Sequence, residues 1–497
     1  MTNFFEKLFT KYPIKTNRSL SAVPGLVSWT LIFFPLWGSI IVPYAVAYFI
    51  LFFDVWWFYR SFSLAITAYL GSKKINEAEK QNWLEKGEKL ENFDKVNHVI
   101  IIPNYKETPE KLRRIVGTLA AQTFPLKRIH VVLAMEKREE EGKKKANQII
   151  KEYESVFGGI YAAYHPDILG EVKGKSSNES YAGKEIDKIL IETNKIDLDY
   201  ATITTADADS MFDRQYFSYL AYDFLKEPKR YNRFWQSANV DHNNFWSVPA
   251  ATRIFSFFSS LWRTGLLVQG DRLIATSTYS LSFRLIKEIG FWDTDVIPED
   301  YRVFFKAFFA KKGDISANPI FLKTTMDSPL SATYIDSLKN KYSQIRRWSY
   351  GASDDPLFIK WYLTVPGVPF IKKTKILFHV LLDHFLWPAN WFILTVATNA
   401  IVFLNPIFAR TTIGYKLPVL SRIILTTSLI ALVIMVLIDY RNRPKHLSKS
   451  KFRELIFPLE FILMPIAGFF LNALPAMISH TQLMLGKKME YKVTEKL

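Results

Sequence analysis

Residues 201–209 read Ala-Thr-Ile-Thr-Thr-Ala-Asp-Ala-Asp, and this stretch decides the fold class of the chain. Its first part is rich in β-branched residues, which is typical of a short buried strand. Similar runs occur at 99–102, 129–133, 160–164 and 234–238, with helical patterns between most of them, such as 110–122, 138–156 and 214–225. This alternation predicts an α/β fold with a doubly wound, mainly parallel sheet.

Asp207 and Asp209 follow the end of that strand. In a doubly wound sheet the ligand lies beyond the carboxyl ends of the strands. Two carboxylates and a bound diphosphate would give Mg²⁺ or Mn²⁺ a shell made only of oxygen atoms. The alternative is that these residues cap the helix predicted to follow them.

Two further motifs come after predicted strands. Ile102-Pro-Asn-Tyr-Lys-Glu107 leaves the first strand, and it also fits an ordinary turn in which Pro109 opens a helix. Glu136 follows the second strand, where it could accept hydrogen bonds from a base or ribose. It could equally be a carboxylate at a helix start, which the helix dipole favours.

Residues 171–178, Glu-Val-Lys-Gly-Lys-Ser-Ser-Asn, predict a flexible loop that presents Lys173 and Lys175 to a diphosphate. The loop lacks the Walker spacing, which argues against a P-loop nucleotidase. A solvated basic loop is the alternative.

Glu299 and Asp300 follow a stretch with Trp292 and Pro298, and a carboxylate in an apolar setting is suited to act as a general base. They could also be helix-capping groups. Gln344-Ile-Arg-Arg347-Trp348 lies on a predicted amphipathic helix just before a membrane segment. Arg and Trp there are either lipid anchors or groups that hold a leaving diphosphate and stack on a sugar or base.

Composition narrows the classes of protein. The 497 residues carry a formal charge of +17 and no Cys, which excludes a disulfide scaffold, thiolate zinc sites and a cysteine nucleophile. Hydrophobic residues make up 49%, which excludes intrinsic disorder. The basic residues cluster beside apolar segments, so anionic lipid rather than nucleic acid accounts for them.

Two apolar regions flank the middle of the chain. The first has room for two spanning helices, near 25–42 and 44–70, since one span needs about 20 residues. Basic residues on both sides place both flanks in the cytoplasm by the positive-inside bias; they are Lys7, Lys11, Lys15, Arg18, Lys73 and Lys74.

In the second apolar region, 376–404 and 419–440 each have the length of a span. Residues 455–485 have a basic cluster before them and a basic tail after them. Basic residues at both ends predict a hairpin or re-entrant pair, which leaves five or six membrane segments open. The cluster is Arg441, Arg443, Lys445, Lys449, Lys451 and Arg453, and the tail spans Lys487 to Lys496.

The domain organisation expected from these patterns has seven parts. They are a cytoplasmic segment (1–24), two transmembrane helices (25–72), a charged linker (73–91), the α/β domain (92–333), interfacial helices (334–370), a carboxy-terminal transmembrane region (371–486) and a cytoplasmic tail (487–497). The expected location is the cytoplasmic membrane, with several crossings and the α/β domain in the cytoplasm.

The order of the motifs, with membrane helices on both sides, resembles the membrane-embedded family-2 glycosyltransferases. This group includes cellulose, chitin and hyaluronan synthases, and the resemblance covers about residues 92–370. It implies a GT-A-like domain, a nucleotide-sugar donor that carries UDP, a divalent metal and an inverting displacement. The acceptor would be a glycan or a lipid, in contact with membrane lipids; protein partners cannot be named.

The resemblance also implies roles for single residues. Asp300 would be the general base with Glu299 beside it, and Asp209, with Asp207, would bind the metal. The other implied residues contact the donor: Pro103, Tyr105, Glu107, Glu136, Lys175, Asn178, Asp207, Gln344, Arg347 and Trp348.

Two departures from the family pattern bear on function. Glu136 stands where the family usually has Asp, and residues 275–280 read Ala-Thr-Ser-Thr-Tyr-Ser instead of the Phe-x-Gly-Thr-type acceptor motif. A processive synthase that secretes its polymer and an enzyme that transfers one or a few sugars therefore both remain. A catalytically silent membrane scaffold or transport component is the alternative from another class.

Three other features are less decisive. The aromatic helix predicted at 253–267 is expected to rest on the membrane, with a glycan-binding surface as the alternative. His165 and His242 are expected in loops. Asp383 and His384, near the start of the third span, could line a glycan path, meet a lipid head or mark an interfacial helix start.

Overall fold

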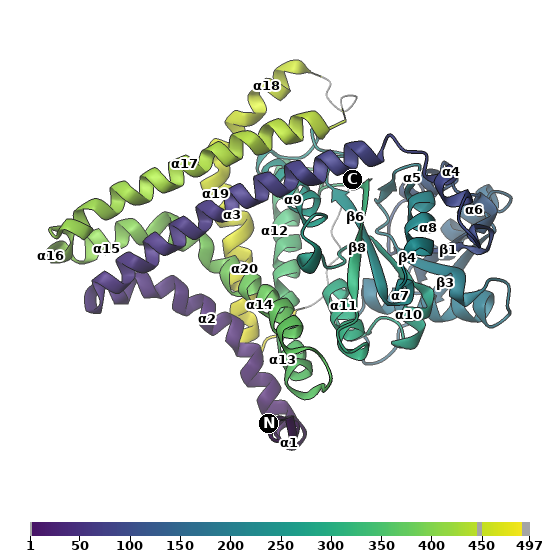
Figure 1. Ribbon diagram of the computed structural model, residues 1–497, viewed down its shortest axis with the longest axis horizontal. Coiled ribbons are helices and arrows are strands. Elements are labelled where there is room, and N and C mark those ends of the chain that lie inside the picture. The colour runs from purple at the N-terminus through teal and green to yellow at the C-terminus, as the bar shows by residue number, and fades with distance from the viewer. Residues whose placement is uncertain (1, 445–449, 490–497) are drawn as a thin grey trace.

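The structure, a computed structural model, describes residues 2–444 and 450–489. A mixed sheet with helices on both faces lies at one end of the molecule, and long helices extend away from it at the other (Figure 1). Lys445, Lys449 and the tail beyond residue 489 lie outside the described residues.

The sheet has eight strands in the order β3-β2-β1-β4-β7-β6-β8-β5. The β3–β2–β1–β4 block and the β6–β8 pair are parallel, whereas β4–β7, β6–β7 and β5–β8 are antiparallel. The strands are β1 (Asn97–Asn104), β2 (Ile129–Glu136), β3 (Gly159–His165), β4 (Ala201–Thr205), β5 (Met211–Phe212), β6 (Arg233–Val240), β7 (Tyr279–Ser282) and β8 (Ser316–Thr325). The expected α/β fold with a mainly parallel sheet is confirmed, and all five predicted strand runs lie in it.

Alternate residues of the strands face two separate cores. Val99 and Ile101 of β1 pack into one core, and Ile100 and Ile102 pack into the other. Such strands are covered on both faces, as doubly wound sheets require. Helices α7 (Lys175–Ile186), α10 (Phe283–Glu288) and α11 (Glu299–Ala310) cover the first face, and α5 (Pro109–Ala120), α6 (Gly142–Tyr153) and α8 (Tyr216–Lys226) cover the second.

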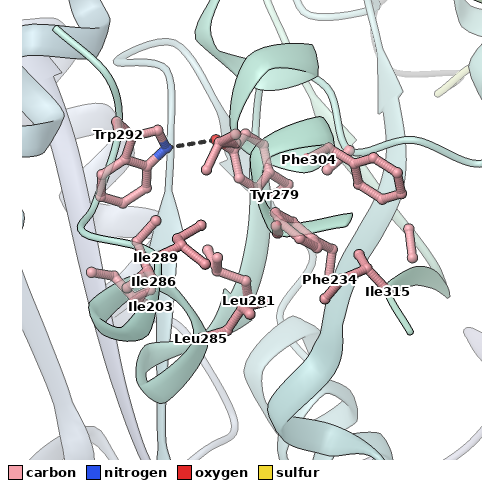
Figure 2. Close-up of a cluster of buried hydrophobic side chains, with 14 of the residues drawn as sticks. Ile203, Phe234, Tyr279, Leu281, Leu285, Ile286, Ile289, Trp292, Phe304 and Ile315 are labelled. Carbon is pink, nitrogen blue, oxygen red and sulfur yellow. Dashed lines mark hydrogen bonds between the residues drawn. The ribbon is translucent and has the colours of Figure 1, made fainter. Parts of the chain in front are cut away.

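The first core holds the aromatic side chains behind the candidate site. Phe234, Tyr279 and Phe304 gather there, and Trp292 Nε1 donates a hydrogen bond of 2.8 Å to the Tyr279 hydroxyl (Figure 2). This bond satisfies the polar end of a buried indole. It also fixes the segment just before Glu299 against the sheet.

Five helical segments are long and apolar enough to cross a membrane, which supports a membrane protein. The first four are α2 (Pro13–Ile41), α3 (Pro43–Ala78), α14 (Phe370–Phe392) continued through η8 (Ile393–Ala397) and α15 (Thr398–Leu404), and α17 (Thr412–Asn442). They converge at the end of the molecule farthest from the sheet (Figure 1). The short helices are α1 (Thr2–Lys11), α4 (Trp83–Glu88), α13 (Asp355–Thr364) and α16 (Pro406–Ala409).

The fifth segment is one unbroken helical run, so the predicted hairpin or re-entrant pair at 455–485 is wrong. The run consists of α18 (Lys451–Glu460), η10 (Phe461–Leu463), α19 (Met464–Gly468), η11 (Phe469–Ala473) and α20 (Leu474–Met484). Its three prolines lie close to changes of helix type: Pro458 shortly before one, and Pro465 and Pro475 directly after one. They alter the helix without reversing the chain. α20 packs against α2 and also against α12 (Tyr334–Ser349).

α9 (Ala250–Leu266) packs against α3 and β6, and its Arg253 binds Glu460 of α18 at 2.8 Å. One further expectation is corrected. Arg443, expected in a lipid-facing basic cluster, is buried, pairs with Asp439 and lies 4.0 Å from the Phe245 ring centroid. An apolar, aromatic helix is as suited to contact protein as lipid, and only its neighbours decide between them.

Candidate active site

Lys175 lies at the centre of a cluster of carboxylates. It is the first residue of α7, so the flexible loop predicted there is wrong at this position. Its Nζ lies 2.7 Å from Glu299 Oε1, 2.9 Å from Asp207 Oδ1 and 3.6 Å from Glu179 Oε1. Lys175 therefore serves as the shared counter-charge of three acids that come from three different segments.

The electrostatics of the cluster follow from burial and from this one cation. Burial alone would lower the pKa of Lys175, but Asp207, Glu299 and Glu179 raise it well above its usual value. Burial raises the pKa of Glu299 and of Asp300, and Lys175 opposes both changes. The carboxyl groups are thus poised to take up a proton more readily than exposed acids do.

Ser277 connects Asp207 with Asp300, a role that no sequence pattern predicted. Its Oγ donates to Asp207 Oδ2 at 2.5 Å, and its backbone N–H donates to Asp300 Oδ2 at 3.1 Å. Ser277 has a φ of 61°, a left-handed conformation that is uncommon for serine. This backbone turns the segment before β7 so that it meets both acids.

Asp209 is buried, and its Oδ2 accepts a 2.8 Å hydrogen bond from the backbone N–H of Asp327. Among residues 2–444 and 450–489 there is no group of three or more His, Asp or Glu side chains that could hold a metal ion. Asp207 and Asp209 still provide two carboxylates on one short loop, which suits Mg²⁺ or Mn²⁺ if diphosphate and water complete the shell. The residues thus fit a metal that is held together with the donor.

A second group of predicted residues gathers at the ends of β1 and β2. Glu136 Oε2 lies 3.3 Å from Arg138 Nε and 3.6 Å from His165 Nδ1, and the Arg138 guanidinium lies 4.1 Å from the Tyr105 ring centroid. Asn178 donates to the backbone oxygen of Ala134 at 2.7 Å. These residues form a polar and aromatic wall next to α7, the helix that begins with Lys175 of the carboxylate cluster.

His165 is a member of this wall that was expected to be an ordinary loop group. It ends β3, is buried, and its Nε2 lies 2.9 Å from Glu171 Oε2. Burial lowers its pKa, but Glu136 and Glu171 outweigh that effect and raise it.

Pro103, within β1, pairs in register with Ala134, and Glu107 forms an ion pair with Lys111 at 2.9 Å.

The third group lies on α12. Gln344 is buried and accepts a 2.9 Å hydrogen bond from Lys341, whose Nζ lies 5.0 Å from the Trp348 ring centroid. Arg347 is half-buried on the same helix. The Arg263 guanidinium lies 5.9 Å from the Trp348 ring centroid.

Arg263 ties this third group to the sheet, because its Nη1 lies 3.2 Å from the carboxylate of Asp241, which directly follows β6. Sequence reasoning missed Lys341, Arg263 and Asp241. No spacing pattern distinguishes them from other charged residues.

Arg302 is another residue that sequence reasoning missed. It lies two residues after Asp300 and holds the Asp354 carboxylate at 2.6 and 3.0 Å, with Asp293 at 3.4 Å. Asp354 ends η7 (Tyr350–Asp354), the turn that follows α12. Arg302 therefore connects the helix of the predicted base with the helix that carries Gln344, Arg347 and Trp348.

Residues 202–438 match the family described as "Glycosyl transferase family group 2". The matched stretch contains Asp207, Asp209, Asp300 and Arg347, and it ends within α17. On the α/β sheet described above, this match supports a glycosyltransferase, an enzyme that transfers a sugar from a nucleotide sugar.

Particular proteins resemble the chain only distantly. The mannosyltransferase PcManGT from Pyrobaculum calidifontis, solved with GDP-Man and Mn²⁺, is 13% identical with a TM-score of 0.40, over 86% of this chain and 100% of that one. S. aureus TarS 1-349 with UDP-GlcNAc is 13% identical with a TM-score of 0.38, over 79% and 93%. No curated protein matches the chain.

Proposed function

We propose that the chain is an inverting, metal-dependent membrane glycosyltransferase that moves a sugar from a UDP-sugar to a glycan or lipid acceptor. The observation that carries the proposal is the double role of Ser277, which binds Asp207 and Asp300 at once. A proposed donor-side carboxylate and a buried carboxylate suited to be the base are thereby held next to each other by one residue. A single displacement needs this arrangement of donor and base.

In the proposed reaction an acceptor hydroxyl oxygen attacks the anomeric carbon, and the bond from that carbon to the diphosphate oxygen breaks. Asp300 takes the hydroxyl proton, and the nucleoside diphosphate leaves. Burial raises the pKa of Asp300, which improves it as a proton acceptor near neutral pH. Glu299, in contact with Lys175, is the reserve candidate for the base.

The donor would lie between the carboxylate cluster and the wall formed by Tyr105, Glu136 and Asn178. Asp209 and Asp207 would hold Mg²⁺ or Mn²⁺, which supplies positive charge to the diphosphate when bound. Arg347 would stabilise the charge of the departing diphosphate, and Trp348 would stack on a sugar or base. Pro103 and Glu107 would shape the entrance from β1.

The proposed location is the cytoplasmic membrane with the α/β domain in the cytoplasm. Four segments, α2, α3, α14–α15 and α17, would cross it. Residues 275–280 lack the polymer-synthase acceptor motif, which favours transfer of one or a few sugars over a processive polysaccharide synthase.

The test is a panel of nucleotide sugars with detergent-solubilised full-length protein, followed by nucleotide release and sugar transfer. Asp300→Asn should bind donor almost normally but transfer sugar about 10²–10⁴-fold more slowly, since it loses general-base help. Asp94→Asn, the same change at an exposed aspartate distant in sequence from this segment, is the control. EDTA should stop turnover, and Mn²⁺ or Mg²⁺ should restore it.

Transfer by Asp300→Asn within a few-fold of the unaltered protein would show that Asp300 is not the base. Undiminished turnover in EDTA would overturn the metal site. Absence of release from every nucleotide sugar in the panel, by protein that is shown to be folded, would contradict the proposed reaction as a whole.

A further inference from the structure

A cavity lies where the α/β domain meets the spanning helices, and no step proposed above uses it. It is small, with a free volume of about 20 Å³, room for about one water molecule, and it is partly open to the surroundings. Its walls come from α9, the turn η6 (Gly270–Arg272), α11 and α14; the polar and aromatic lining residues are Trp262, Asp271, Arg272, Tyr301, His379 and Asp383. We call it the Arg272 pocket.

Two guanidinium groups share one carboxylate at this pocket. Arg272 Nη2 lies 3.2 Å from Asp383 Oδ2, and Arg60 Nη2 of α3 lies 3.6 Å from Asp383 Oδ1. Asp271, also in the lining, is already paired with Lys375. One carboxylate cannot balance two arginines, so the Arg60–Asp383–Arg272 triad carries a net positive charge.

The triad is open enough to receive a ligand. The exposed fractions of the side chains are 32% for Arg60, 41% for Asp383 and 26% for Arg272. Arginine is the side chain best suited to phosphate, because its planar fork donates two parallel hydrogen bonds. An anion with phosphate chemistry could therefore replace Asp383 between the two guanidiniums.

The pocket adjoins the proposed base along the chain. Tyr301 of its wall directly follows Asp300, and Ile274 of its wall lies three residues before Ser277, which binds Asp300. The opposite wall is α14, and Arg60 belongs to α3; both are candidate spanning helices. A molecule anchored beside α3 and α14 could thus hold its head in the pocket and direct a hydroxyl toward Asp300.

We propose that the Arg272 pocket binds the phosphate of a membrane-anchored acceptor, through Arg60 and Arg272, and so selects a phosphorylated lipid carrier over a neutral glycan. The inference rests on the proposed function and specifies its acceptor class. The bond that forms still joins an acceptor hydroxyl oxygen to the anomeric carbon. The phosphate positions the acceptor and takes no part in the displacement.

The test measures binding of phosphatidic acid, a lipid with a phosphate monoester, to full-length protein in neutral detergent micelles. Diacylglycerol controls for the lipid tails, and inorganic phosphate controls for the free anion. Arg60→Gln and Arg272→Gln should each weaken phosphatidic acid binding by about tenfold, since each loses a charge-assisted contact. Asp383→Asn should tighten it, because the competing carboxylate is gone.

Arg422→Gln, an exposed arginine on α17, should leave binding unchanged and controls for general attraction of anionic lipid. Arg272→Lys keeps the charge and should retain part of the affinity if Arg272→Gln does not fold. Asp383→Asn separates binding from mere structural pairing: if it weakens binding as the arginine variants do, the triad is structural and the inference fails.

Equal binding of diacylglycerol, or of inorganic phosphate without the lipid, would also overturn the inference. Donor-dependent nucleotide release from the same preparations keeps the two proposals apart. Release without phosphatidic acid binding would refute only the pocket, whereas lipid binding without release from any donor would refute only the proposed reaction.

Discussion

At the scale of single residues, Lys175 determines the charge of the candidate site. Its Nζ contacts the carboxylates of Asp207, Glu299 and Glu179, and its side chain is only 15% exposed. Removing one partner of a buried ion pair leaves the other partner uncompensated, which commonly costs about 3–5 kcal/mol. A substitution of Lys175 is therefore expected to disturb the site more through the loss of its charge than through a change of shape.

The first prediction concerns the pH dependence of Lys175→Met. Proton transfer needs ionised Asp300, so kcat/KM should fall as pH falls through the pKa of Asp300. Lys175 lowers that pKa, whereas burial raises it. Without the lysine the pKa rises further, so the acidic limb should move to higher pH. The measurement is a pH profile of kcat/KM on folded protein.

Lys173→Met is the matched control, because Lys173 lies two residues away, is 52% exposed and pairs with the exposed Asp167. It should leave the profile in place, and Lys175→Arg should keep the limb near its original pH. An unmoved limb in Lys175→Met would mean that the group seen in the profile is not in this cluster.

Sequence reasoning located the acids but not their partners. Asp207, Glu299 and Asp300 could be predicted because acids beside strand and helix ends carry a local pattern. The helical start at Lys175 could not, since it depends on distant contacts, such as Ser176 Oγ donating to the Asp293 oxygen at 2.5 Å. The link through Ser277 could not be predicted either, because the backbone N–H that donates to Asp300 leaves no pattern in the sequence.

At the scale of elements, α11 is where the site and the membrane-proximal helices are coupled. Glu299 and Asp300 lie in its first turn, and Arg302 in the same turn holds η7. The side chains of Arg302 and Asp354 are 11% and 4% exposed, so water screens this pair little. A change at α12 can therefore reach Asp300 through one buried ion pair.

The second prediction concerns Arg302→Met. The variant leaves Asp354 buried without its partner, so we expect a loss of about 3–5 kcal/mol in the free energy of unfolding. Kinetically it should lower kcat more than it changes KM for the donor, because Arg302 positions α11 and is expected to leave donor contacts intact. Denaturant titration and steady-state kinetics measure the two effects.

Arg302→Lys should retain part of the free energy of unfolding and part of kcat, which keeps the test usable if Arg302→Met does not fold. Arg284→Met is the control: its ion pairs are exposed and should contribute only about 0–1 kcal/mol. Equal losses for Arg302→Met and Arg284→Met would refute a positioning role.

The elements that the sequence missed share a physical cause. β7 is a four-residue strand with two serines, and β8 contains Pro319, so neither shows an uninterrupted β-branched run. Both belong to the mixed half of the sheet, where pairing partners come from distant segments. The parallel half was predictable because each strand there carries its own apolar pattern.

At the scale of the whole molecule, the path of the run α18–α20 decides the topology. Its 34 residues would extend about 50 Å at 1.5 Å per residue, more than the roughly 30 Å of a bilayer core. Length alone would thus allow a crossing. Yet Glu460 near one end binds Arg253 of α9, and His480 near the other lies 3.2 Å from the Ser349 oxygen of α12.

Both α9 and α12 belong to the part of the chain between the two pairs of spanning helices, so the two ends of the run contact the same side of the molecule. In Figure 1 the yellow run lies beside α9 and α12, which it contacts. The basic residues on both flanks of 455–485 indicated that both ends of the run lie on the same side of the membrane. A helix that lies along the membrane boundary explains this without a hairpin.

The last prediction follows from this topology. The chain contains no Cys, so single cysteines can be introduced without a background of native thiols. Arg441→Cys precedes the run, Lys487→Cys follows it, and both positions are exposed; Arg410→Cys marks the far end of the helices beside α16. An impermeant maleimide should label Arg441→Cys and Lys487→Cys from the same side of the membrane, and Arg410→Cys from the other. Lys89→Cys, exposed near the sheet, reports the side of the α/β domain. If Lys487→Cys is labelled together with Arg410→Cys, the run crosses the membrane as a fifth span and the boundary helix is refuted.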